Sequence, residues 1–199
     1  MATDLESLIL THGAGSNSRA PLLVALANAL GECGAYVLRY DLPFRQERPH
    51  GPPRPGDAAR DREGLRAEIV KIRASKGGEV WLGGHSYGGR QASILAAETP
   101  GLVDGLLLLS YPLHPPKKPE QLRTAHFPAL HTPALFVHGS RDPFASLQEL
   151  QQAIALIPAA ARIMEIEGAG HELGRDHRAL AKRIVAELKP VMKTPRGGT

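Results

Sequence analysis

Short aliphatic runs alternate along this chain with longer stretches of helical periodicity, and this alternation restricts the possible folds more than any other feature. Between the first two runs, Leu22, Leu26 and Leu30 are spaced to form one apolar helix face. A strand–helix rhythm maintained along a chain favours a parallel sheet covered by helices on both faces. We therefore expect a three-layer α/β fold with about six mostly parallel strands. The expected strands are residues 5–11, 35–41, 79–83, 104–110, 133–138 and 161–166.

Two proline-rich segments interrupt this rhythm. Residues 44–60 (FRQERPHGPPRPGDAAR) combine proline with arginine, which predicts an exposed, partly mobile loop. Residues 111–132 follow an expected strand and contain YPLHPP, whose prolines preclude a continuous helix. A chain of 199 residues is long enough for one ordinary domain. We expect a single domain over residues 1–199, without a helical cap domain.

Composition excludes several classes of function. The net charge of +4 is mild, and no basic stripe carries interleaved aromatics, so nucleic acid is not an expected partner. The single cysteine, Cys33, excludes an internal disulfide and a cysteine-built zinc site, and we expect a buried, inert thiol. No apolar run approaches membrane-spanning length, and MATDLESLIL carries acids where a signal peptide carries basic residues. We expect a cytoplasmic protein without a membrane partner.

A cluster of glycines surrounds one serine. Residues 84–88 (GHSYG) fit the pattern Gly-x-Ser-x-Gly and lie between an expected strand and the helical stretch 91–98. This strand–turn–helix context is typical of a nucleophile elbow, in which a strained serine projects its hydroxyl above the sheet. Glycines are needed there because side chains two residues from the serine collide with the tight turn. Ser86 is therefore the candidate nucleophile.

The partners that a serine nucleophile needs are present in the order that this architecture uses, which is serine, acid, histidine. Asp142 follows the strand expected at 133–138, and His171 follows the strand expected at 161–166. The carboxyl ends of parallel strands meet at one edge of a sheet. The sequence therefore predicts a catalytic triad of Ser86, Asp142 and His171.

Other histidines have simpler interpretations. His85 adjoins the serine, but successive side chains point apart, so it is interpreted as a packing residue. His138 ends a strand before a glycine, which favours a turn histidine over a catalytic base. The pair His171 and His177 lacks the His-Glu-x-x-His spacing of zinc proteases. No metal ion or organic cofactor is therefore expected.

An oxyanion hole needs two backbone N–H donors. One is expected from Tyr87, the residue after the nucleophile, and the other from the loop HGAG at residues 12–15. Ala14 is the favoured donor in that loop, with Gly15 second. The remaining candidate pocket residues come from three loops after strands: His12, Gly13, Gly15, Tyr111, Leu113, His114 and Phe144.

The same loop offers an alternative interpretation. The stretch GAGSNS, followed by a strand that ends at Asp41, imitates a dinucleotide-binding unit. Ser18, however, stands where that fingerprint requires a third glycine. An incomplete fingerprint is weaker evidence than a complete triad.

The motifs LTHGAG, GGHSYGGR, HGSRDPF and GAGH resemble, in this order, those of the α/β-hydrolases over essentially the whole chain. The chain is most similar to a small subgroup related to dienelactone hydrolases, which includes bacterial hypothetical hydrolases and the animal testis-expressed protein thirty. SYPLHPPKKPEQLRTAHF is the most specific match. The resemblance implies the same triad. Relatives usually carry one or two more strands before LILTHGAG, so strand 35–41 is expected at an edge, covered by the 44–60 loop or by a second subunit.

These observations predict a serine hydrolase that cleaves small carboxylic esters or thioesters through an acyl-enzyme on Ser86. Two alternatives remain open. One is a scaffold or binding protein with little turnover, and the other is an acyltransferase or peptidase that uses the same triad. The expected partner is a small-molecule substrate, and either a monomer or a homodimer fits the sequence.

Overall fold

A computed structural model of the chain describes residues 5–192, with only the backbone described for 189–192. Residues 1–4 and 193–199 of the expected domain therefore lie outside the described residues. The strands form one parallel sheet in the order β2-β1-β3-β4-β5-β6, which confirms the predicted architecture. Their bounds are β1 Ser7–Thr11, β2 Tyr36–Tyr40, β3 Val80–His85, β4 Gly105–Leu109, β5 Ala134–Gly139 and β6 Ala161–Ile166.

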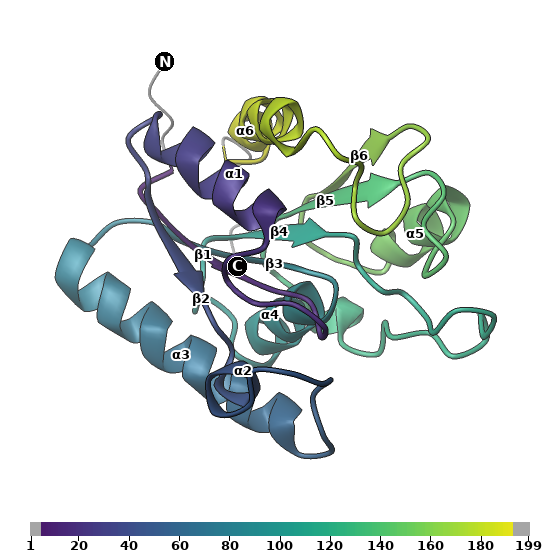
Figure 1. Cartoon of the computed structure of the whole chain (residues 1–199), viewed down its shortest axis with the longest axis horizontal. Coiled ribbons are helices and arrows are strands. Elements are labelled where there is room, and N and C mark those ends of the chain that lie inside the picture. The colour runs from purple at the N-terminus through teal and green to yellow at the C-terminus, as the bar shows by residue number, and fades with distance from the viewer. Residues whose placement is uncertain (1–4, 193–199) are drawn as a thin grey trace.

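Helices cover both faces of this sheet (Figure 1). Helices α1 (Pro21–Gly31) and α6 (His177–Met192) pack together on one face. The opposite face carries α3 (Asp57–Lys76), α4 (Tyr87–Glu98) and α5 (Leu147–Ile154). Two short elements complete the described chain, α2 (Pro43–Glu47) and the 3₁₀ turn η1 (Phe127–Ala129).

Each central strand supplies both layers of the core, because successive side chains point to opposite faces. In β4, Leu106 and Leu108 pack on the side of α3 and α4, while Leu107 and Leu109 pack on the side of α1 and α6. All four leucines are fully buried, and burying such a side chain stabilises the fold by about 1.5–3 kcal/mol. This two-sided burial explains why the strand appears as an uninterrupted apolar run.

The strand order also locates a binding edge. The chain moves outward from β1 to β2 and then crosses back to β3, which pairs with the other side of β1. At such a switch point the loops after the two neighbouring strands separate and leave a crevice at their carboxyl ends. The loops concerned here are residues 12–20, after β1, and the turn at Ser86, after β3.

The prediction of an irregular exposed loop across residues 44–60 is wrong at both ends. Helix α2 occupies its first part, where Pro43 starts the helix with its pre-set φ and Phe44 is fully buried. Helix α3 begins at Asp57, which is itself buried. Arg45, which we expected in solvent, is only 6% exposed. Local composition failed because buried contacts from distant residues stabilise this segment.

Three further expectations concern the surface. Residues 110–133 contain only η1 as a regular element, so the predicted absence of a cap domain is confirmed. Strand β2 lies at the sheet edge, as expected, and Tyr36 on it is 42% exposed. Cys33 is half-buried and follows the end of α1, so the expectation of a buried thiol is wrong. Within residues 5–192, no helix combines the length and apolarity needed to cross a bilayer.

Candidate active site

The backbone between β3 and α4 turns sharply at Ser86. This residue has φ 50° and ψ −114°, in the region that L-residues rarely adopt, and it projects from the carboxyl end of β3. The flanking glycines are required by contact distances. A Cβ on Gly84 would lie 2.7 Å from the carbonyl carbon of Gly88, and a Cβ on Gly88 would lie 2.6 Å from the carbonyl oxygen of His12. The glycine cluster therefore serves the close approach of β1, β3 and α4.

Three loops bring Ser86, His171 and Asp142 into one hydrogen-bonded chain. His171 Nε2 lies 2.8 Å from Ser86 Oγ, and His171 Nδ1 lies 2.8 Å from Asp142 Oδ2. The Asp142 side chain is fully buried, and its other oxygen accepts from the Phe144 N–H at 2.9 Å. Because an ionised carboxylate only accepts, Nδ1 of the histidine holds the proton and Nε2 is free to accept the serine proton.

Two neighbours fix the backbone of His171. Ser110 Oγ donates to the His171 carbonyl at 2.6 Å, and His85 Nε2–H donates to the same oxygen at 2.9 Å. Burial lowers the pKa of His85, which favours the neutral ring, and the carbonyl acceptor places the proton of that ring on Nε2. Beyond the packing role expected from sequence, His85 thus contacts the candidate base directly. Ser110 was missed, although its place at the carboxyl end of β4 was a usable signal.

The other candidate histidines occupy different places. His138 is fully buried behind the acid, with Nε2 bonded to the Ala145 carbonyl at 2.8 Å and Nδ1 4.0 Å from Asp142 Oδ2. Across residues 5–192, no group of three or more His, Cys, Asp or Glu side chains has the geometry to hold a metal ion. Phe144 lies with its ring centroid 4.3 Å from that of His171. It packs against the candidate base and is not among the residues that line the cavity, so the expectation that Phe144 is a pocket residue is wrong.

A cavity of about 420 Å³ opens beside Ser86 and His171. It lies toward the start of α1 and the segment after β6. Its lining residues are His12, Gly13, Ala14, Gly15, Ser16, Ala20, Pro21, Leu22, Leu23, His85, Ser86, His171, Glu172 and His177. Sequence reasoning anticipated the loop after β1 but missed the start of α1 and the residues that follow His171.

The expectation that Tyr111, Leu113 and His114 line this cleft is wrong. Tyr111 and Leu113 are fully buried on the α3–α4 side of the sheet, and His114 is 5% exposed. Ser110 has a positive φ of 47°, and after it the chain enters the core, where the Tyr111 ring packs 5.4 Å from Phe127. These residues therefore support the sheet and leave the cleft to α1.

Near Ser86, the backbone N–H groups of Ala14 and Tyr87 have no protein acceptor among the residues that the structure describes, and those of Gly15 and Gly88 have none either. The loop after β1 passes directly beside the serine, since a Cβ on Gly13 would lie 3.6 Å from Ser86 Cβ. The Tyr87 hydroxyl donates its proton to Asp61 Oδ2 at 2.7 Å, so the donor that Tyr87 can offer to a ligand is its backbone N–H. The N–H groups of Tyr87 and Ala14 are thus available to a ligand, and so is that of Gly15, the second candidate in the loop.

A nucleophile elbow and a Ser–His–Asp chain on a parallel α/β sheet define a known superfamily architecture. The model of the alpha/beta hydrolase domain family matches residues 4–190, nearly the whole chain. The chain belongs to the alpha/beta hydrolase family. This membership confirms the resemblance seen in the motifs and supports hydrolase activity.

Solved structures show the same fold at low sequence identity. An alpha-beta serine hydrolase homologue from Coxiella burnetii has 19% identity and a TM-score of 0.76, with 94% of this chain and 86% of that chain covered. Dienelactone hydrolase from Anabaena variabilis has 20% identity and a TM-score of 0.71, with coverages of 92% and 84%. An α/β serine hydrolase without lid from Xanthomonas campestris has 17% identity and a TM-score of 0.65, with coverages of 98% and 86%.

Proposed function

We propose that this alpha/beta hydrolase cleaves small carboxylic esters or thioesters through an acyl-enzyme on Ser86. The observation that carries the proposal is the hydrogen-bonded chain from Asp142 through His171 to Ser86 at the mouth of a cavity. A serine hydroxyl becomes a useful nucleophile only when an oriented base accepts its proton. The relatives with the same fold include serine hydrolases and a dienelactone hydrolase, which supports the same class of chemistry.

In the proposed reaction, Ser86 Oγ attacks the substrate carbonyl carbon while His171 Nε2 accepts the hydroxyl proton. Asp142 orients the imidazole and stabilises the imidazolium that forms. The negative charge on the former carbonyl oxygen is stabilised by the N–H groups of Ala14 and Tyr87. Collapse of the adduct expels the alcohol or thiol, which takes the proton from His171. A water molecule then releases the acid by the same two steps, and Ser86 regains its proton.

The cavity favours short acyl groups. Its volume of about 420 Å³ is in the lower part of the range for small-molecule sites, and no cap domain covers it within residues 5–192. Leu22, Leu23 and Pro21 supply a limited apolar wall. Each methylene contributes about 0.8 kcal/mol only if the protein removes it from water. We therefore expect acetyl to butyryl esters to react best, without activation at a lipid interface.

Labelling with a fluorophosphonate probe, combined with a series of p-nitrophenyl esters and thioesters, tests this proposal. Wild-type protein should be labelled and should show its highest kcat/KM at two to four acyl carbons, and Ser86→Ala should lose both properties. Ser93 is a suitable control because its Oγ lies 2.8 Å from His126 Nε2, a second serine–histidine pair outside the cavity. Ser93→Ala should be labelled like wild type. Equal labelling of Ser86→Ala, or no labelling of wild type, would exclude the mechanism.

A further inference from the structure

Arg45 is a buried arginine without an acidic partner. Only 6% of it is exposed, and no carboxylate in the described part of the chain forms an ion pair with it. Its guanidinium instead donates to four backbone carbonyls: Ser16 at 2.7 Å, Ala14 at 2.8 Å, Gly51 at 2.9 Å and Arg48 at 3.1 Å. A buried charge is costly unless hydrogen bonds satisfy it. The guanidinium group of Arg45 therefore joins the loop after β1 to the turn at residues 48–51.

His12 fixes the peptide that precedes Ala14. The Leu42 N–H donates to His12 Nε2 at 3.2 Å, so the proton of the neutral ring is on Nδ1. Nδ1–H then donates to the Gly13 carbonyl at 2.9 Å, and the Ser16 N–H donates to the same oxygen at 3.1 Å. In a planar trans peptide the C=O and N–H point in opposite directions. Holding the Gly13 carbonyl therefore aims the Ala14 N–H away from His12.

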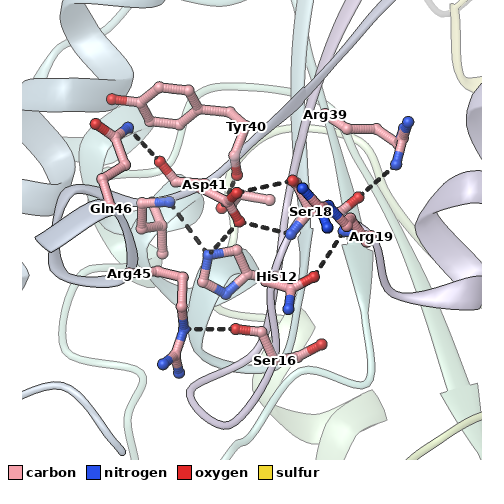
Figure 2. A network of polar contacts seen from close by, with 12 residues as sticks. His12, Ser16, Ser18, Arg19, Arg39, Tyr40, Asp41, Arg45 and Gln46 are labelled. Carbon is pink, nitrogen blue, oxygen red and sulfur yellow. Dashed lines mark hydrogen bonds and ion pairs between the residues drawn. The ribbon is translucent and has the colours of Figure 1, made fainter. Parts of the chain in front are cut away.

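The far end of the loop is also held. Asp41 Oδ1 accepts from the Ser18 N–H at 2.6 Å, and Asp41 Oδ2 accepts from the Ser18 hydroxyl at 2.9 Å. Figure 2 shows His12, Asp41 and Arg45 gathered around the loop, with Arg45 directed at the Ser16 carbonyl. Both oxygens of Asp41, the residue that ends the strand of the apparent dinucleotide-binding unit, are thus bonded to Ser18, which stands in place of the third glycine.

The second candidate donor depends on the same short helix. Asp61 is fully buried, and its Oδ1 accepts from the Phe44 N–H at 3.0 Å, next to Arg45 in α2. Its Oδ2 accepts from the Tyr87 hydroxyl at 2.7 Å. Helix α2 is therefore connected to Tyr87 through Asp61 and to Ala14 through Arg45. Helix α2 is thus linked to both residues whose N–H groups are the favoured donors, Tyr87 through its hydroxyl and Ala14 through its carbonyl.

We propose that Arg45 and His12 are positioning residues for the oxyanion hole. They hold the two peptides that flank Ala14, Arg45 through the Ala14 carbonyl and His12 through the Gly13 carbonyl. This inference rests on the proposed hydrolase function, because it assigns the aim of the Ala14 N–H to side chains that are not themselves oxyanion donors. Such residues act on the transition state, where the oxyanion exists, more than on the bound ester.

Arg45→Lys and His12→Gln test the proposal, with Arg62→Lys as the matched control. Arg62 is also largely buried and donates to a backbone carbonyl, that of Ala58, but it contacts α4 and not the loop after β1. The measurements are kcat and KM for p-nitrophenyl butyrate, the Ki of a short alkyl trifluoromethyl ketone, and the thermal unfolding midpoint. Ser86 Oγ adds to the carbonyl carbon of the ketone while His171 takes the hydroxyl proton, and the resulting hemiketal carries a stable oxyanion.

Losing one oxyanion donor costs about 10²–10³ in kcat, so a misaimed donor should cost about 10- to 100-fold. In both variants kcat and ketone affinity should fall by similar factors, with KM changed less than about threefold. Arg62→Lys should keep the wild-type kcat, KM and Ki. A folded Arg45→Lys or His12→Gln with wild-type kcat and Ki, or with a change in KM alone, would overturn the inference. If one variant does not fold, the other decides.

Failure of the proposed function is distinguishable from failure of this inference. A wild-type protein without turnover and without fluorophosphonate labelling would refute the hydrolase function itself. An active wild type whose folded Arg45 and His12 variants retain its kcat would refute only the positioning roles.

Discussion

Replacing Gly88 by alanine should damage both stability and catalysis, and the size of each effect follows from three contacts. An added Cβ would lie 2.6 Å from the His12 carbonyl oxygen, 2.7 Å from Thr11 Cγ2 and 3.2 Å from the His12 nitrogen. Cβ atoms in proteins are essentially never closer than 3.0 Å to such atoms, so a shift of at least about 0.4 Å is needed. Two of the three atoms are backbone, and Thr11 is fully buried, so no side chain can simply rotate away.

Overpacking of this kind costs about 1–3 kcal/mol, partly offset by up to about 1 kcal/mol of helix propensity. We expect a net loss of about 1–2 kcal/mol, or about 2–8 °C in Tm. The displaced atoms begin the loop that carries Ala14. Since a misplacement of about 1 Å can cost 10²-fold in rate, this shift should lower kcat by about 10-fold.

The assay is urea unfolding together with kcat on a short p-nitrophenyl ester. Gly31→Ala is the matched control, because Gly31 is also helical and an added Cβ there meets nothing within 4 Å. That control should be neutral or more stable by up to about 1 kcal/mol, with unchanged kcat. A Gly88→Ala variant with wild-type stability and rate would refute the steric reasoning. A variant that loses stability but not rate would refute only the link to the oxyanion loop.

Two further predictions concern titratable groups. Asp142→Asn should keep the fold but lower kcat by roughly 10⁴-fold, because an amide presents a proton to His171 Nδ1 and favours the wrong tautomer; a loss below about 10-fold in steady-state kinetics would argue against that role for Asp142. Burial, and secondarily the charge of Arg90, lowers the pKa of His126 from 6.5 to about 4. Below pH 6.5 the unfolded chain therefore binds a proton that the folded chain does not, so stability falls between pH 6.5 and pH 4. Because the ring is partly exposed, we expect His126 to account for about 1–2 kcal/mol of that loss. Urea unfolding at pH 7 and pH 4.5 should show a smaller loss of unfolding free energy for His126→Asn than for wild type. Equal losses in the two proteins would show that His126 is not the cause.

Features encoded in short stretches were predictable from the sequence. The six strands were found because each contains several apolar residues in a short stretch between turns, and the parallel arrangement followed from the intervening helices. The residues that meet as Ser86, Asp142 and His171 were found for a related reason. Each follows a strand, and the carboxyl ends of parallel strands share one edge, so sequence position already implied proximity.

Tertiary structure alone decided on which side of the carboxyl edge of the sheet the cavity lies. Sequence placed the cleft against Tyr111 and Leu113, but the chain after Ser110 turns into the core, and the cavity lies against α1. The direction of that turn depends on packing against Phe127 and Phe136, which are far along the chain.

The burial of Arg45 was also decided by the tertiary structure. The proline and arginine residues around it predicted an exposed side chain. In the structure, two of its carbonyl acceptors lie about thirty residues away in the loop after β1. A charged side chain becomes part of the interior only when distant backbone groups converge on it, because only they can replace the water that it loses. That convergence is a property of the folded chain, and no local pattern encodes it.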